Sequence, residues 1–162
     1  MINTDKTFCT YENIYYEMWE IAGRYTEIAQ FQVIGKSHDD RMIPMVQIGK
    51  GAETVFCIAG LSGRDRCMPI YLMHMLKEYV KAWECRWKLE NLYDLRVLLE
   101  DWKICFIPLL NPDGYEIYEK DFYAIRNPIY RQMLRMQEIP CKEFICNSRG
   151  VNLRKNFPTQ YY

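Results

Sequence analysis

The stretch Thr54–Leu76, TVFCIAGLSGRDRCMPIYLMHML, decides the fold. It opens with the apolar run TVFCIAG, whose length and continuity predict a β-strand buried on both faces. A short polar loop with Ser62, Arg64 and Asp65 follows. Apolar residues then recur at the spacing of one helix face: Met68, Leu72, Met75, Leu76 and Tyr79. Strand, loop and helix in this order are typical of an α/β protein.

The residues before this stretch predict a helix and two strands. Thr10 is a suitable N-cap for a helix that runs to about Ala29. Strands are expected at residues 31–36 and 42–49, joined by a hairpin turn, SHDDR. Pro44 removes a backbone donor, which predicts that the second strand lies near a sheet edge.

The residues after it predict further alternation of helix and strand. Leucines at helical spacing favour a helix over residues 90–100, and WKICFIPLL at 102–110 is a second buried strand. NPDGY, with Asp113 and Gly114, is interpreted as a turn. Residues 127–137 favour a helix and residues 149–162 a loop. We therefore expect an α/β fold with one domain over residues 1–162.

Composition excludes some partners and indicates a compartment. Lysine plus arginine equals aspartate plus glutamate at 21 each, so net charge favours neither nucleic acid nor a membrane surface as partner. The seven cysteines are odd in number and contain no Cys-x-x-Cys pair. Cys141 and Cys146 are expected to be buried or free thiols. There is no basic-then-apolar leader, and the expectation is a reduced, cytoplasmic protein.

Four segments in order carry a family resemblance: GLSGRDR, IPLLNPDGYE, YRQMLR and GVNLRKNFP. Together they resemble the zinc metallocarboxypeptidases of the carboxypeptidase A type. The resemblance implies an α/β fold with a mixed β-sheet flanked by helices. It covers nearly the whole chain but only the first half or so of a typical catalytic domain, so the expected domain is truncated.

The resemblance also implies a zinc ion held by two histidines and a glutamate, with an open position for water. Ser62 and Asp65 occupy the first histidine and glutamate positions. Asp65 is a shorter carboxylate that could still bind zinc, whereas a serine hydroxyl is a poor zinc ligand at neutral pH. The family's second histidine ligand and catalytic glutamate lie beyond Tyr162. His38 and His74 are expected on the surface, so no catalytic zinc is expected in this chain alone.

Family positions that bind substrate are kept in part. Arg64 matches the arginine of the first motif, and Arg131 is the match for the oxyanion arginine. In the last motif Asn152, Arg154 and Lys155 replace aspartate, asparagine and arginine, while Asn156 is unchanged. With Arg149, these cations would converge on the family's substrate cleft. They form either a pocket for a peptide C-terminus or other small carboxylate, or an ordinary basic surface.

Three functions stay open. The favoured one is a catalytically defective homologue that keeps a carboxylate-binding cleft. The second is a zinc carboxypeptidase completed by another polypeptide or by a partner subunit. The third is an interaction protein that uses an exposed sheet edge. A serine hydrolase built on Ser62 is disfavoured, because the loop lacks the final glycine of Gly-x-Ser-x-Gly.

The resemblance further implies an unpartnered strand. In the family, the strand that leads into the zinc-binding loop lies inside the sheet, and one of its neighbours comes from the second half of the domain. Without that neighbour, TVFCIAG has a free apolar edge, and such edges pair with other chains. We therefore expect a homodimer that covers this edge.

Overall fold

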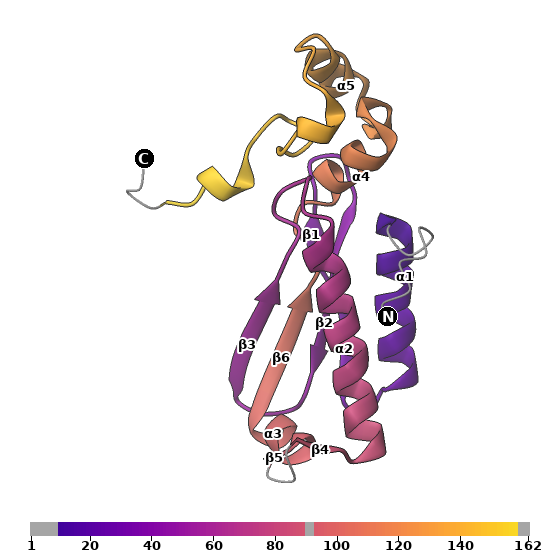
Figure 1. Ribbon diagram of the computed structural model, residues 1–162, viewed down its shortest axis with the longest axis vertical. Coiled ribbons are helices and arrows are strands. Elements are labelled where there is room, and N and C mark those ends of the chain that lie inside the picture. Colours follow the sequence, from indigo (N-terminus) through magenta and orange to yellow (C-terminus); the bar gives the residue numbers. More distant parts are fainter. Residues whose placement is uncertain (1–9, 90–92, 159–162) are drawn as a thin grey trace.

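The computed structural model describes residues 10–89 and 93–158, and its centre is a four-stranded mixed sheet (Figure 1). The strand order is β1-β2-β6-β3, with β1 antiparallel to β2, β2 antiparallel to β6, and β3 parallel to β6. The strands are β1 (Ala29–Lys36), β2 (Met42–Ile48), β3 (Glu53–Ile58) and β6 (Trp102–Ile107). The expected α/β fold with a mixed sheet is confirmed.

Helices α1 (Tyr11–Arg24) and α2 (Cys67–Cys85) lie side by side over one face of the sheet (Figure 1). Their buried residues follow the helical spacing: Tyr11, Ile14, Met18, Ile21 and Ala22 from α1, and Pro69, Leu72, Met73, Leu76 and Val80 from α2. They pack on Val46, Ile48, Ile104 and Phe106 of the sheet. No helix in the described ranges is long and apolar enough to cross a membrane.

The predicted end of the first helix was wrong, although its start was correct. Thr10 caps α1 by accepting a hydrogen bond from Asn13 N at 3.2 Å. The helix ends at Arg24, and Ala29 is already the first residue of β1. Ile28 is buried in the same core as the helix face, so the apolar pattern continued across the turn. Met68 was also predicted for a core-facing position, yet it lies exposed in the first turn of α2.

Pro44 does not mark an edge strand, because β2 lies inside the sheet between β1 and β6. The pairing of β1 with β2 is irregular between Val33 and Gly35, and Pro44 is the partner of Val33. A bulge locally interrupts the ladder, so a residue without an N–H is tolerated there. The tertiary pairing therefore overrides the sequence signal at this position.

The strand β3 is not buried on both faces, contrary to the prediction from its apolar run. It pairs only with β6 among the described residues, and it forms the edge of the sheet. Val55, Phe56 and Ile58 are exposed. Among the described residues, the other edge of β3 is therefore unpaired.

The remaining segments lie at the two ends of the sheet (Figure 1). At one end are β4 (Lys88–Leu89), β5 (Tyr93–Asp94) and α3 (Leu95–Asp101). The helix predicted over residues 90–100 is thus shorter, and residues 90–92 lie outside the described residues. At the other end are α4 (Pro112–Lys120), a 3₁₀ turn at Phe122–Ala124, α5 (Pro128–Arg135) and further 3₁₀ turns at Cys141–Glu143 and Leu153–Lys155.

NPDGY begins a helix, so its interpretation as a simple turn was wrong. Asn111 is the N-cap of α4, and its Oδ1 accepts a hydrogen bond from Gly114 N at 3.0 Å. Pro112 follows at the first helical position, where a missing N–H costs nothing. Asn-Pro-Asp-Gly is therefore a helix start here, and it places the Asp113 side chain in the interior.

Candidate functional site

The candidate site is the loop between β3 and α2, which contains Ser62, Arg64 and Asp65. This loop lies against the connection from β6 to α4. Asn111 N donates to Gly60 O at 2.8 Å, and Asn111 Nδ2 donates to Leu61 O at 3.1 Å. The asparagine that caps α4 therefore also fixes the loop that precedes α2.

Two glycines make this close approach possible. A Cβ added to Gly63 would lie 2.5 Å from the carbonyl oxygen of Gly114, and a Cβ added to Gly114 would lie 2.5 Å from Cys146 O. Gly60 adopts a positive φ of 65°, which favours glycine. GLSGRDR and NPDGY are distant in the sequence, and their backbones are in contact at these glycines.

A shallow cavity of about 280 Å³ lies at this loop. Its polar lining is Ser62, Asp65 and Arg154, and its apolar lining is Ile58, Ala59, Leu61 and Met68. We call it the loop cavity. The structure thus brings three of the predicted site residues together from two distant segments.

Asp65 holds the backbone of the loop. Its Oδ2 accepts a hydrogen bond from Gly60 N at 3.2 Å, and its Oδ1 accepts one from Met68 N at 3.2 Å. Both oxygens are therefore used at the start of α2, where a carboxylate is also favoured by the helix dipole. This is a capping role.

Replacing Asp65 by alanine is expected to lower the free energy of unfolding by about 1 kcal/mol, as for the loss of a helix cap. The measurement is urea denaturation followed by circular dichroism. Ser62→Ala is the matched control, because the hydrogen bond that Ser62 Oγ accepts from Arg64 N is long, at 3.4 Å. It should change the unfolding free energy by less than about 0.5 kcal/mol. Equal effects of the two variants would contradict the capping role.

The residues present do not fit the zinc ion that the family resemblance implies. Ser62 offers a neutral hydroxyl, and both Asp65 oxygens already accept backbone hydrogen bonds. Within residues 10–89 and 93–158, no group of three or more histidine, cysteine, aspartate or glutamate side chains is placed to hold a metal. His38 and His74 are exposed, as expected.

The other predicted substrate-binding residues do not line the loop cavity. Arg64, Lys155 and Asn156 are exposed. They are close in sequence to lining residues, but they do not line the cavity themselves. Arg131 is half-buried and donates to backbone carbonyls, from Nε to Ile125 O at 2.8 Å and from Nη2 to Arg126 O at 3.3 Å.

Arg149 and the two late cysteines also lie apart from the cavity. The Arg149 guanidinium lies 6.0 Å from the centre of the Tyr130 ring. Cys141 and Cys146 are half-buried free thiols, as expected, and burial raises the pKa of Cys146.

A larger apolar hollow of about 800 Å³ lies between α2, α3 and the start of β6. Tyr79, Trp87, Leu98 and Trp102 are among its lining residues. None of the predicted site residues lines it, and it is not part of the candidate site.

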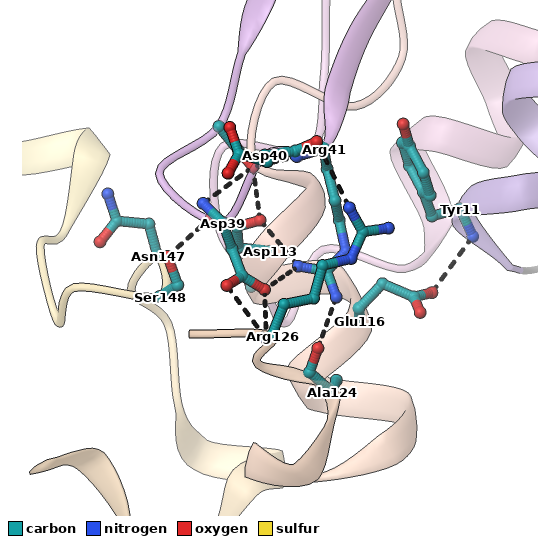
Figure 2. Close-up of polar contacts among 12 residues, drawn as sticks. Tyr11, Asp39, Asp40, Arg41, Asp113, Glu116, Ala124, Arg126, Asn147 and Ser148 are labelled. Atoms are coloured by element: carbon teal, nitrogen blue, oxygen red, sulfur yellow. Dashed lines mark hydrogen bonds and ion pairs between the residues drawn. The ribbon is translucent and has the colours of Figure 1, made fainter. Parts of the chain in front are cut away.

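Sequence reasoning missed a buried ionic cluster of Asp39, Arg41 and Asp113 (Figure 2). Arg41 Nη1 lies 2.6 Å from Asp39 Oδ2 and 3.0 Å from Asp113 Oδ1, and these side chains are 5% exposed or less. Arg41 Nη2 donates to Ala124 O at 2.6 Å. The available signal was three charges, Asp39, Asp40 and Arg41, within the hairpin turn SHDDR.

Each carboxylate of this cluster accepts further hydrogen bonds, which Figure 2 shows in part. Asp113 accepts from Ser37 Oγ at 2.6 Å and from Ser148 Oγ at 2.8 Å. Asp39 accepts from the backbone N–H of Arg126 at 2.8 Å and from that of Asn127 at 2.9 Å. The cluster therefore joins the hairpin turn, α4 and two later loops.

The charge state of Arg41 follows from these contacts. Burial acts to lower the pKa of its guanidinium, but the hydrogen bonds and charges of Asp39 and Asp113 outweigh burial, so the pKa of Arg41 is raised. A raised pKa in a cation gives stability that is lost only when the pH rises through the folded-state pKa. Arg41 is therefore charged at neutral pH.

Known proteins resemble this chain in sequence and in fold. The family model described as zinc carboxypeptidase matches residues 14–162. A metallocarboxypeptidase A of Trichophyton rubrum is 24% identical over 165 residues, which cover 99% of this chain and 35% of that protein. A metallocarboxypeptidase A of Arthroderma otae is 22% identical with the same coverage. The chain thus spans about a third of the length of these relatives.

Solved structures show the same fold. Bovine thrombin-activatable fibrinolysis inhibitor, solved with a tick carboxypeptidase inhibitor, matches with a TM-score of 0.60 and 15% identity, covering 85% of this chain and 36% of that one. A metallo-carboxypeptidase from Burkholderia cenocepacia matches with a TM-score of 0.58 and 14% identity, covering 88% of this chain and 31% of that one. The chain belongs to the zinc carboxypeptidase family.

Proposed function

We propose that this chain binds small carboxylates, such as a peptide C-terminus, and does not by itself assemble a catalytic zinc centre. The observation that carries the proposal is the position of Arg154, which lines the loop cavity together with Ser62. Arginine in the last motif and serine in the first are both departures from the family pattern, and they lie in one cavity.

Three features of the loop cavity suit a carboxylate. The Arg154 guanidinium presents paired N–H donors with the spacing of two carboxylate oxygens. The Ser62 hydroxyl is a further donor. The amino end of α2, a 19-residue helix, carries a partial positive charge at the same place.

Two further features limit what the loop cavity accepts. The Asp65 carboxylate also lines it, but both of its oxygens accept backbone hydrogen bonds. These N–H dipoles partly offset its negative charge. The apolar wall of Ile58, Leu61 and Met68 suits a hydrophobic side chain next to the bound carboxylate. A carboxylate that carries an apolar group is therefore the proposed ligand.

Replacing Arg154 by alanine is expected to weaken carboxylate binding about tenfold or more, because a charge-assisted contact is lost. The measurement is isothermal titration of the chain with N-acetyl-phenylalanine, and N-acetyl-phenylalanine amide serves as the ligand control. Lys155→Ala is the matched protein control, because Lys155 is an exposed neighbouring cation outside the cavity wall. An equal loss in both variants, or equal binding of acid and amide, would contradict the proposal.

A second candidate is a zinc carboxypeptidase completed by another chain, and zinc measurement separates the two. The chain is purified without chelator, its zinc content is measured, and release of C-terminal residues from peptides is assayed. The proposal expects substoichiometric zinc and no turnover, because the residues at two ligand positions do not fit the metal. Stoichiometric zinc with turnover would overturn it in favour of the enzyme.

The compartment is part of the proposal. The six described cysteines are all free thiols, which fits a reducing environment such as the cytoplasm.

A further inference from the structure

We propose that Asp113 is a positioning residue for carboxylate binding, because its buried carboxylate holds the segment that brings Arg154 to the loop cavity. The inference rests on the proposed function, and it assigns a role to a residue outside the cavity wall. Asp113 is only 1% exposed, so its effect on a ligand passes through the groups that it binds. Its surroundings reach both walls of the cavity.

The two oxygens of Asp113 bind different parts of the chain (Figure 2). Oδ1 accepts a hydrogen bond from Ser37 Oγ at 2.6 Å and one from Arg41 Nη1 at 3.0 Å, and both donors belong to the hairpin turn between β1 and β2. Oδ2 accepts a hydrogen bond from Ser148 Oγ at 2.8 Å. One carboxylate therefore fixes a late loop of the chain against the hairpin turn.

Ser148 belongs to a closed turn over residues 147–151, which Asn147 holds together. Asn147 N donates to Val151 O at 3.0 Å, and Asn147 Oδ1 accepts from Val151 N at 3.0 Å. Asn147 Oδ1 also accepts from Arg149 N at 3.0 Å. Asn147 and Ser148 are both buried. The turn is therefore a hydrogen-bonded unit, and the Asp113 carboxylate binds its buried corner.

Arg154 follows this turn closely. It lies in the 3₁₀ turn Leu153–Lys155, and Asn152 caps that turn by accepting a hydrogen bond from Arg154 N at 3.1 Å. Three residues separate Val151 from Arg154 along the chain, and they can span at most about 10 Å. The segment is thus both short and capped, so the position of Ser148 strongly restricts the position of Arg154.

The start of α4 also holds the opposite wall of the loop cavity. Asn111, two residues before Asp113, donates from Nδ2 to Leu61 O at 3.1 Å and to Cys146 O at 3.2 Å. Leu61 is a lining residue, and Cys146 directly precedes the closed turn. The loop before α2 and the late segment therefore meet at α4, and the bond between Asp113 and Ser148 fixes the late segment there.

The separation of the two walls decides whether one carboxylate meets both proposed donors. Ser62 lines the cavity from the loop before α2, and Arg154 lines it from the late segment. Hydrogen bonds are lost beyond about 3.5 Å between donor and acceptor, and a site that is about 1 Å too loose loses much of its function. Loosening the late segment should therefore weaken binding although the arginine is still present.

The test compares Ser148→Ala with Ser37→Ala, because each removes one hydroxyl that donates to the Asp113 carboxylate. Isothermal titration with N-acetyl-phenylalanine measures binding to the full chain. The dissociation constant should rise about fivefold or more in Ser148→Ala, and less than about twofold in Ser37→Ala, where Arg41 still holds Oδ1. Circular dichroism and urea denaturation check that both variants fold.

A double variant tests whether Ser148 acts through Arg154. Residues that act through one interaction give losses that do not add. Ser148→Ala combined with Arg154→Ala should therefore bind N-acetyl-phenylalanine no more weakly than Arg154→Ala alone. Additive losses would show that the serine acts by another route, and equal losses in Ser148→Ala and Ser37→Ala would show a general loss of structure. Either result would overturn the positioning role.

Hydrogen exchange measured by mass spectrometry tests the positioning role without any ligand. Backbone amides of residues 151–156 should exchange about tenfold faster in Ser148→Ala than in the unaltered chain, and at an unchanged rate in Ser37→Ala. Unchanged exchange in Ser148→Ala would overturn the role of Asp113. If the unaltered chain fails to bind the acid, the carboxylate proposal is wrong, and the exchange rates still decide whether Asp113 positions the late segment.

Discussion

Replacing Arg41 by methionine is expected to lower the free energy of unfolding by about 3–5 kcal/mol. Arg41 is the one cation between two buried carboxylates in this cluster, Asp39 and Asp113. Methionine fills much of the same volume, so the expected loss comes from two carboxylates left without their counter-charge in the interior. Urea denaturation followed by tryptophan fluorescence and circular dichroism measures it.

The matched control is Lys77→Met, which breaks the ion pair between Lys77 and Glu17 at the surface, where both side chains reach solvent. Surface pairs contribute little, and this variant should lose less than about 1 kcal/mol. Similar losses in the two variants would show that the buried cluster contributes no more than an exposed ion pair. That outcome would contradict the role given to Arg41.

Replacing Gly63 by alanine is expected to lower the free energy of unfolding by about 3 kcal/mol, at the upper end of what overpacking costs. The added Cβ would lie 2.5 Å from Gly114 O and 2.8 Å from Gly114 C. These are backbone atoms of the first turn of α4, so no side chain can rotate away to make room. The loop before α2 and the start of α4 would have to separate.

Gly23→Ala is the control for this prediction. Gly23 lies in α1, and an added Cβ would meet no atom within 4 Å. Alanine is favoured over glycine in a helix, so this variant should be more stable by about 0.5–1 kcal/mol. Opposite signs for the two substitutions are expected, and a neutral Gly63→Ala variant would contradict the close backbone contact.

The buried cluster and the loop cavity are connected through α4. Asp113 belongs to the cluster, its neighbour Gly114 contacts Gly63, and Asn111 hydrogen-bonds the loop at Gly60 and Leu61. The cluster therefore helps to hold the loop whose Ser62 lines the cavity. Burying charged groups is by itself unfavourable for stability. Here the buried charges join four separate segments of the chain.

The sequence by itself determined the order of the elements and the family. Local signals sufficed for the capped start of α1, the strand-loop-helix unit around GLSGRDR, and the buried strand β6, because hydrophobic periodicity and capping depend on neighbouring residues. Four motifs in one order indicated the zinc carboxypeptidase family. The substitutions at Ser62 and Asp65 could also be read directly, because motif positions need no coordinates.

Only the tertiary structure decided the properties that depend on distant partners. It showed that Pro44 lies inside the sheet opposite a bulge, that Asp113 starts a helix and binds Arg41, and that Arg154 alone of the predicted cations reaches the loop cavity. A charged turn in the sequence looks the same whether it is solvated or buried, because burial is set by segments far along the chain. The exposure of β3 has the same reason. Its apolar sequence predicts a strand, but the order of the strands in the sheet determines how many neighbours that strand has among the described residues.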